Sequence, residues 1–158
     1  DQGKEKIKAL DLGTGSGIQA ETLLNQGIKK ENILCSDIDK EAVRRVKSRG
    51  FKTIGSDVFS KIKGKFDLIS FNPPYLPEDT QDKEKDTTGG KLGDETILAF
   101  LQQAKNHLKK EGKIFLLFSS LTPQKRIIKE IKKQKFKILA FKEKNLFFER
   151  LFVFIFSL

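Results

Sequence analysis

Short apolar runs, separated by polar segments that contain glycine, recur along the whole chain. Residues 6–12 alternate between polar and apolar side chains before Gly13, and residues 66–71 form a mainly apolar run before Asn72. Alternation with a period of two and short apolar runs both predict β-strands. By the same criteria we expect further strands at residues 32–35, 51–54, 113–119, 135–143 and 147–157.

Segments with helical spacing alternate with these predicted strands, at residues 18–26, 40–49, 94–108 and 123–134. Asp39 is a favourable N-cap for the second helix, and Gly27 and Gly50 are suited to end the first two. Strands alternating with helices predict right-handed βαβ units and a parallel sheet. The last two strands predict an antiparallel hairpin at the sheet edge, turning at residues 144–145. The predicted fold class is therefore α/β: a doubly wound, mostly parallel, seven-stranded Rossmann-like sheet with a C-terminal antiparallel hairpin.

Composition narrows the class of protein. A length of 158 residues predicts one domain over residues 1–158. The sequence contains no methionine, so we expect a natural N-terminal segment to be missing. The single Cys35 excludes an internal disulfide framework and a cysteine zinc site, and no metal site is expected. No apolar stretch approaches the roughly 18–20 residues that cross a bilayer, so a cytoplasmic protein is expected.

The formal net charge of +10 comes entirely from the C-terminal third. Residues 105–144 contain twelve lysines and one arginine against three glutamates. Such a basic block can bind nucleic acid, or it can be a solvated helix face whose lysine stems cover apolar surface. No aromatic residues interleave with the lysines as in base-stacking proteins, which favours the solvated face.

Asn72-Pro73-Pro74-Tyr75 follows the apolar run 66–71. The side-chain oxygen of Asn72 and the carbonyl of Pro73 are hydrogen-bond acceptors, and two successive prolines stiffen the backbone. Two rigid acceptors beside the Tyr75 ring are suited to bind a planar amino group. The same tetrapeptide could also be an ordinary turn at the end of a strand.

Polar residues also follow the three preceding strands. The first strand leads into Asp11-Leu12-Gly13-Thr14-Gly15-Ser16-Gly17, a glycine-rich turn that is a weak signal alone. Asp37 could accept the ribose hydroxyls of a nucleoside. Asp57 could accept from an adenine amino group, with the Val58 N–H as a donor. Each aspartate alone could be a cap or a turn residue, but their succession at strand ends predicts a nucleoside-containing ligand.

Together these residues resemble the class I S-adenosylmethionine-dependent methyltransferases. Within them the chain resembles the HemK/PrmC-type protein-(glutamine-N5) methyltransferases of the archaeal and eukaryotic branch, because residues 89–93, Gly-Gly-Lys-Leu-Gly, match a segment of that family. The resemblance implies S-adenosyl-L-methionine as cofactor and S-adenosyl-L-homocysteine as product. It assigns cofactor binding to Asp11, Gly13, Thr14, Gly15, Gly17, Asp37, Ile38, Asp57, Val58 and Asn72.

The resemblance also implies a reaction and partners. Asn72 and the Pro73 carbonyl would accept both N–H bonds of a substrate glutamine, with Pro74 and Tyr75 against its planar group. Asn72, Pro73 and Tyr75 are thus the expected catalytic residues. The expected substrate is the Gly-Gly-Gln motif of a translation release factor. A small zinc-binding activator subunit is a further implied partner.

Two other functions stay open. The Asn-Pro-Pro-Tyr turn also suits N6-adenine methyltransferases acting on RNA or DNA, because a flipped base presents the same planar amino group. Alternatively, the chain could be a non-catalytic interaction module with a methyltransferase fold. The polar segment 76–93 is long for a loop and is expected to be functional or disordered.

Overall fold

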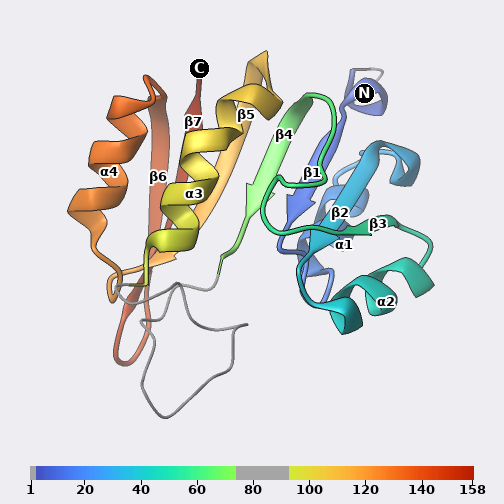
Figure 1. Cartoon of the computed structure of the whole chain (residues 1–158), viewed down its shortest axis with the longest axis horizontal. Coiled ribbons are helices and arrows are strands. Elements are labelled where there is room, and N and C mark those ends of the chain that lie inside the picture. Colours follow the sequence, from blue (N-terminus) through green and yellow to red (C-terminus); the bar gives the residue numbers. More distant parts are fainter. Residues whose placement is uncertain (1–2, 74–92) are drawn as a thin grey trace.

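A seven-stranded sheet organises the protein (Figure 1). The computed structural model describes residues 3–73 and 93–158. The strands are β1 (Ala9–Leu12), β2 (Ile33–Asp37), β3 (Lys52–Gly55), β4 (Phe66–Phe71), β5 (Leu108–Ser119), β6 (Lys137–Asn145) and β7 (Arg150–Ser157). The helices are α1 (Ile18–Asn25), α2 (Lys40–Ser48), α3 (Glu95–Ala104) and α4 (Gln124–Lys133), with short 3-10 turns η1 (Lys4–Lys6), η2 (Lys30–Asn32) and η3 (Lys105–His107).

The strand order β3-β2-β1-β4-β5-β7-β6 confirms the predicted fold class. Strands β1 to β5 pair in parallel, and β7 is antiparallel to both β5 and β6. The C-terminal hairpin therefore lies at one edge, as predicted. Its turn comes later than residues 144–145, because β6 continues to Asn145 and the Leu146 N–H donates to the Glu149 carbonyl at 2.8 Å.

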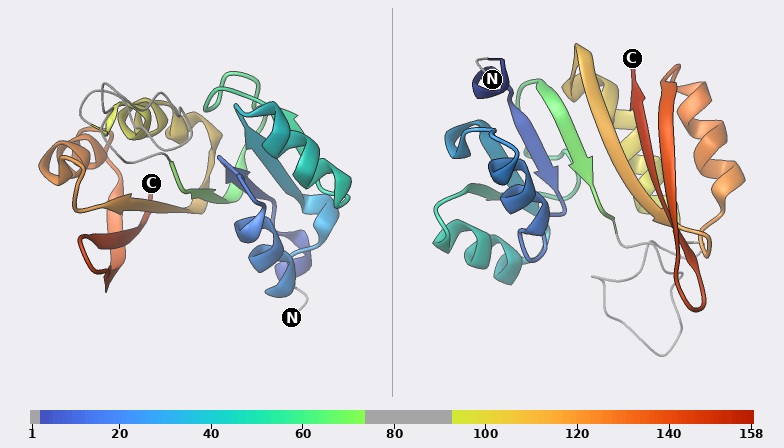
Figure 2. Two further views of the ribbon diagram at one scale, coloured as in Figure 1. Left: turned by 90° about the horizontal axis from the view of Figure 1, so that it is seen from below. Right: turned by 180° about the vertical axis from the view of Figure 1, so that it is seen from behind.

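Helices pack on both faces of the sheet (Figure 2). On one face α1 and α2 share a small core with the central strands, in which Ala20, Cys35 and Val46 are buried. On the other face α3 and α4 cover a larger, aromatic core that includes Phe100 and Phe118. Burial of two opposite faces explains why the central strands are apolar along their length.

Helix ends follow the local signals in the sequence. The Asp39 carboxylate caps α2 by accepting from the Glu41 and Ala42 N–H groups, at 3.0 and 3.2 Å. Gly27 and Gly50 follow the ends of α1 and α2 with φ of +96° and +82°, which confirms them as C-terminal stops.

The third helix is shorter and the fifth strand longer than the sequence predicts. The helix ends at Ala104, and β5 begins at Leu108 rather than at residue 113. The five extra strand residues, 108–112, include three charged ones and show no apolar run. They extend β5 because Leu108 pairs with Phe66 and the Lys109 ammonium binds the Asp67 carboxylate at 2.7 Å.

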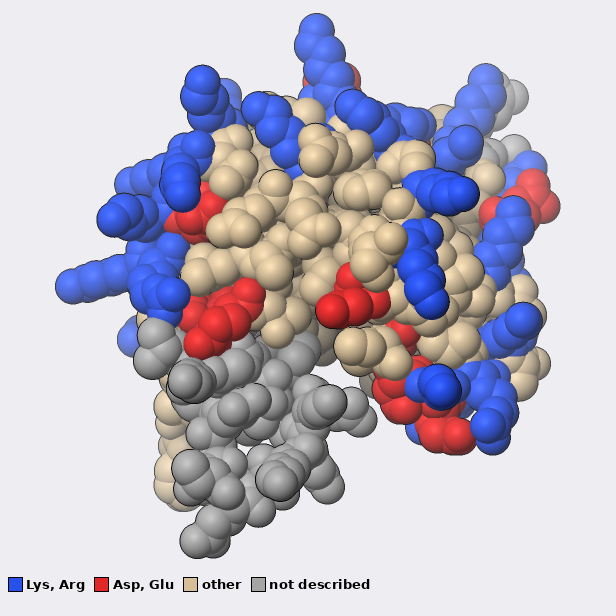
Figure 3. Space-filling view, viewed as in Figure 1, with Lys and Arg blue, Asp and Glu red and all other residues tan. Residues whose placement is uncertain are grey.

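Charge is distributed unevenly over the face in Figure 3. Lys and Arg side chains gather around its upper part and sides, whereas Asp and Glu gather lower down, toward the edge where β1 and β4 end. Of the helices in the described ranges, none has the length and apolar character to cross a membrane.

Candidate functional site

The sheet brings three of the predicted site residues into one row. In β1, Leu12 pairs with Ser36 of β2 on one side and with Phe71 of β4 on the other. The next residues on these strands are Gly13, Asp37 and Asn72, which therefore lie side by side at the C-terminal edge of the sheet. This edge is where open α/β sheets bind ligands.

Hydrogen bonds fix the glycine-rich turn after β1. The Thr14 N–H donates to the Ser36 carbonyl at 2.9 Å, and the Gly17 N–H donates to the Thr14 carbonyl at 2.7 Å. Gly13, Gly15 and Gly17 all have positive φ, a conformation that other residues adopt only at a cost. The sequence predicted a turn here, and the backbone explains why it needs glycines.

Asp37 links this turn to the end of β2. One of its carboxylate oxygens accepts from the Gly15 N–H at 2.8 Å, and the other accepts from the Asp39 N–H at 2.9 Å. These bonds fix the orientation of the half-buried carboxylate. Each oxygen keeps a further lone pair for a ligand hydroxyl, because a carboxylate can accept about four hydrogen bonds.

Asp11 lies beneath the turn and is almost completely buried, at 1% exposure. Its carboxylate accepts from the Thr14 hydroxyl at 2.7 Å. Burial raises the pKa of Asp11 to about 6, and the negative charge of Asp37 adds to the effect, whereas the Thr14 hydrogen bond opposes it. A buried carboxylate with a perturbed pKa beside a glycine turn is typical of a binding site.

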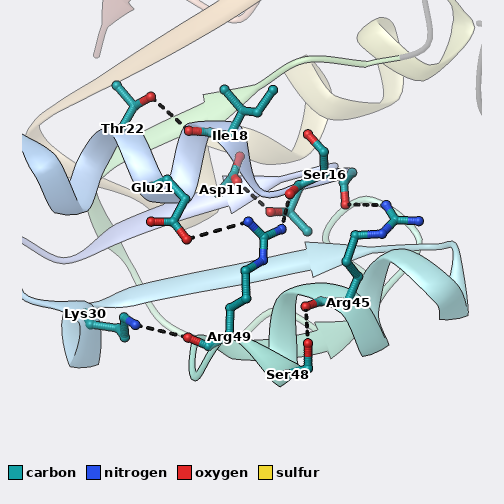
Figure 4. Close-up of polar contacts among 11 residues, drawn as sticks. Asp11, Ser16, Ile18, Glu21, Thr22, Lys30, Arg45, Ser48 and Arg49 are labelled. Atoms are coloured by element: carbon teal, nitrogen blue, oxygen red, sulfur yellow. Dashed lines mark hydrogen bonds and ion pairs between the residues drawn. The ribbon is translucent and has the colours of Figure 1, made fainter.

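Two arginines, Arg45 in α2 and Arg49 at its C-terminal end, hold the outer side of the turn (Figure 4). Arg49 donates to the Ser16 carbonyl and pairs with Glu21 of α1 at 3.6 Å. Arg45 donates to the Gly15 carbonyl at 3.4 Å. A Cβ on Gly17 would lie 2.7 Å from the Arg49 guanidinium. Gly17 is therefore needed for packing against α2, in addition to its φ of +83°.

These arginines were not among the predicted site residues. Arg45 and Arg49 are four residues apart in sequence, and this spacing places them on one helix face. The sequence therefore indicates that the two arginines share a helix face, but it does not indicate that this face packs against the glycine-rich turn.

The turn after β3 carries Asp57 and Val58. Val58 has a φ of +47°, which is unusual for a β-branched residue. The Ser56 hydroxyl stabilises the turn by donating to the Val58 carbonyl and accepting from the Lys61 N–H, at 3.0 and 3.1 Å. The Asp57 side chain is exposed beside this turn. Backbone strain of this kind is concentrated at functional sites.

Ile38 is 63% exposed immediately after Asp37. An exposed apolar side chain next to an ordered carboxylate offers a surface for a flat ligand group.

At the end of β4, Asn72 is exposed and Pro73 is buried. The preceding Phe71 ring packs on Phe100 with centroids 4.6 Å apart, which anchors the strand end. Pro74, Tyr75 and the segment 76–92 lie outside the described residues. Of the Gly-Gly-Lys-Leu-Gly segment, only Gly93 is described, with a φ of +82°.

A cavity of about 420 Å³ lies beside α1 and reaches Asn72. Its walls are mainly apolar and include Leu23, Leu68 and Leu117. Gly13, Asp37 and Asp57 are not among the residues that line it.

Cys35 is buried in β2, and His107 packs on the aromatic core. Burial raises the pKa of the Cys35 thiol to about 12. The His107 ring stacks on Phe59 with centroids 4.5 Å apart, and its Nδ1 lies 3.1 Å from the Gly64 carbonyl.

Comparisons with known proteins identify relatives of the chain. The family model "methyltransferase small domain" matches residues 2–145. A Methanocaldococcus jannaschii protein, named as a candidate protein N5-glutamine methyltransferase, is 35% identical over 156 residues, covering 91% of this chain and 78% of that protein. A release factor glutamine methyltransferase of Lactococcus lactis is 36% identical over 130 residues, covering 72% of this chain and 47% of that longer protein.

Among solved structures, the fold is similar to the methyltransferase of the E. cuniculi Mtq2–Trm112 complex, which is described as responsible for methylation of the eRF1 translation termination factor. The TM-score is 0.77 at 24% identity, over 99% of this chain and 87% of that one.

Proposed function

The chain belongs to the methyltransferase small domain family, and we propose that it transfers a methyl group from S-adenosylmethionine to the side-chain nitrogen of a glutamine in a translation release factor. The observation that carries the proposal is the row of Gly13, Asp37 and Asn72 at one sheet edge. The named activities of the M. jannaschii and L. lactis relatives support the choice of glutamine.

The residues around the glycine turn fit the cofactor. Gly13 and Gly15 offer backbone without side chains, and Asp37 offers an oriented carboxylate to the ribose hydroxyls. Asp57 would accept from the adenine amino group, with the exposed Ile38 against the base. When bound, S-adenosylmethionine supplies an electrophilic methyl group on a positively charged sulfur. The carboxylates of Asp11 and Asp37 suit a cationic ligand.

Asn72 and Pro73 position the acceptor nitrogen. A glutamine amide nitrogen is a poor nucleophile, because its lone pair is delocalised into the carbonyl. The Asn72 side-chain oxygen and the Pro73 carbonyl would accept its two N–H bonds, fix its direction and stabilise positive charge that develops on it. Anchoring of Phe71 on Phe100 keeps these acceptors in place. Pro74 and Tyr75 would complete the substrate site.

The test is Asn72→Ala, with Asn106→Ala as the matched control at an exposed position on η3. Because the other expected cofactor residues remain in place, we expect Asn72→Ala to retain S-adenosylmethionine binding in calorimetry and to lose transfer of labelled methyl to a release factor. Asn106→Ala should keep both. Near-normal turnover by Asn72→Ala would refute the assignment.

Methylation of adenine in RNA is the alternative that uses the same acceptors. On the face in Figure 3, Asp and Glu gather in the lower part, toward the end of the sheet where β4 ends, which disfavours a polyanion there. Mass spectrometry after incubation with a release factor and bulk RNA separates the two. Methyl label in RNA alone would overturn the choice of glutamine.

A small partner subunit is part of the proposal. The similar methyltransferase Mtq2 was solved in complex with Trm112. We expect this chain also to work with a small activator subunit, which the resemblance implies to be zinc-binding. Co-purification from the native host, followed by metal analysis of the complex, tests this expectation.

A further inference from the structure

Two aromatic side chains stand exposed at the turn of the β6–β7 hairpin. Phe147 and Phe148 are 93% and 88% exposed. Their rings contact each other edge to face, with centroids 4.7 Å apart. We call these two residues the aromatic tip. Because both rings are almost fully exposed, neither contributes its surface to the core.

The turn itself does not require phenylalanine. Hairpin turns favour Gly, Asn, Asp and Ser, which suit the backbone and face water. The turn is closed by backbone groups, through the Leu146 N–H and the Glu149 carbonyl. Two adjacent exposed aromatics at such a place are typical of a recognition surface, because aromatic residues dominate interface energetics.

The base of the aromatic tip is tied to the end of β5. The Ser119 hydroxyl donates to the Glu149 carboxylate. The Ser120 N–H donates to the Arg150 carbonyl at 2.8 Å, and the Arg150 N–H donates to the Ser120 hydroxyl at 2.9 Å. These bonds hold the hairpin in a defined place relative to the C-terminal ends of the parallel strands.

Asn72 lies at this same end of the sheet. Phe71 pairs with Leu116 and Leu117 with Val153, so Asn72 lies level with Val153. Phe148 is five residues nearer the turn, which places it up to roughly 17 Å beyond that level at about 3.3 Å per residue. Two strand spacings add roughly 10 Å sideways. Figures 1 and 2 show the hairpin extending past the end of β4.

Local charge indicates the kind of partner. Residues 143–150 contain two acidic and two basic side chains, so the hairpin turn is electrically balanced. Membrane-binding aromatic loops and single-strand nucleic-acid platforms combine aromatics with an excess of Lys and Arg. A balanced, rigid aromatic pair fits a protein surface instead.

We propose that the aromatic tip docks the body of the protein that carries the acceptor glutamine, away from the glutamine itself. The inference rests on the proposed function and names a second contact for the same substrate. The aromatic tip then contributes to capture of the whole protein and not to the chemistry at Asn72.

The test compares two substrates with Phe147→Ser/Phe148→Ser. One substrate is an intact release factor, and the other is a seven-residue peptide centred on its acceptor glutamine. Three extended residues reach only about 10 Å from the glutamine, so the peptide falls short of the aromatic tip. Leu139→Ala, which removes an apolar side chain that is 45% exposed elsewhere on the hairpin, is the control.

We expect the double variant to raise KM for the release factor about 10- to 100-fold, from the loss of two hot-spot side chains. Its kcat, its kinetics with the peptide and its affinity for S-adenosylmethionine should stay within twofold of wild type. Leu139→Ala should match wild type throughout.

Each other result has a definite meaning. An unchanged KM for the release factor overturns the docking inference and leaves the proposed function intact. An equal rise in KM with the release factor and with the peptide overturns the docking inference as well, because the double substitution then acts on the catalytic site or on the fold. Loss of binding to anionic lipid vesicles or RNA, without a change in KM, replaces the protein partner by that ligand. If wild type methylates neither substrate, the proposed function fails and the inference fails with it.

Discussion

Gly17→Ala perturbs the glycine turn at the point where α2 holds it. Gly17 has a φ of +83°, and a Cβ there would lie 2.7 Å from Arg49 Nη2 and 3.1 Å from Val46 Cγ2. The variant therefore combines a strained backbone with a steric conflict. Because the conflict is with the end of a flexible side chain, Arg49 can move away, but only by giving up its contacts.

The expected loss follows from these two parts. Left-handed backbone costs an L-residue about 1–2 kcal/mol. Displacing Arg49 breaks its hydrogen bond to the Ser16 carbonyl and its ion pair with Glu21. Both partners of that pair are more than a third exposed, so these contacts contribute only about 1 kcal/mol together. Gly17→Ala should thus lower the free energy of unfolding by about 2–3 kcal/mol.

A double-mutant cycle separates the two parts. In the Arg49→Ala background the steric conflict with the guanidinium is absent, so the double variant should be about as stable as Gly17→Ala alone. Gly64→Ala is the control for the backbone part, because Gly64 has a φ of +86° and nothing within 4 Å of its added Cβ. Urea denaturation followed by circular dichroism gives each free energy. Full additivity of Gly17→Ala and Arg49→Ala would refute the reasoning, and so would equal losses in Gly17→Ala and Gly64→Ala.

Three further predictions concern the site. Because the pKa of Asp11 is raised to about 6, the native state binds this proton more tightly than the unfolded chain. The free energy of unfolding of wild type should therefore rise relative to that of Asp11→Asn by up to about 3 kcal/mol as pH falls from 7 to below 4. Urea denaturation at a series of pH values measures this difference, and a difference that does not change with pH would contradict the burial effect. Asp37→Asn should weaken S-adenosylmethionine binding by about 10- to 100-fold in calorimetry, because a charged acceptor for the ribose is lost, and unchanged affinity would remove Asp37 from the cofactor site. Val58 has a φ of +47°, so Val58→Gly should be more stable than Val58→Ala by about 1 kcal/mol in the same denaturation assay, whereas alanine is usually the more stabilising of the two residues. A more stable Val58→Ala would show that the backbone there is unstrained.

The sequence was sufficient to predict the row at the sheet edge, because its members all follow short apolar runs. Once these runs are parallel strands in register, Gly13, Asp37 and Asn72 must lie side by side. The signal for each strand is local, and the parallel arrangement follows from general rules of chain connection. Prediction succeeds where local pattern and topology together determine position.

Other features depend on tertiary contacts that no local pattern encodes. The partners of Arg49 are decided by how α2 packs against the turn and α1. The left-handed backbone of Val58 runs against the preference of a β-branched residue, and it is stabilised by the Ser56 hydroxyl. Three of the first five residues of β5 are charged, and the strand conformation of this stretch depends on pairing with β4.

Three departures from what folding alone favours meet at one sheet edge. At the end of β1, the buried Asp11 carboxylate costs about 3 kcal/mol at neutral pH, from the difference between its raised and ordinary pKa. Beyond β2, Ile38 exposes an apolar side chain, and beyond β3, Val58 adopts a strained backbone. A module that only needed the fold would be more stable without all three. Their coincidence at one end of the sheet suits a ligand with a positive charge, a flat apolar group and hydrogen-bonding groups, which is the chemistry of S-adenosylmethionine.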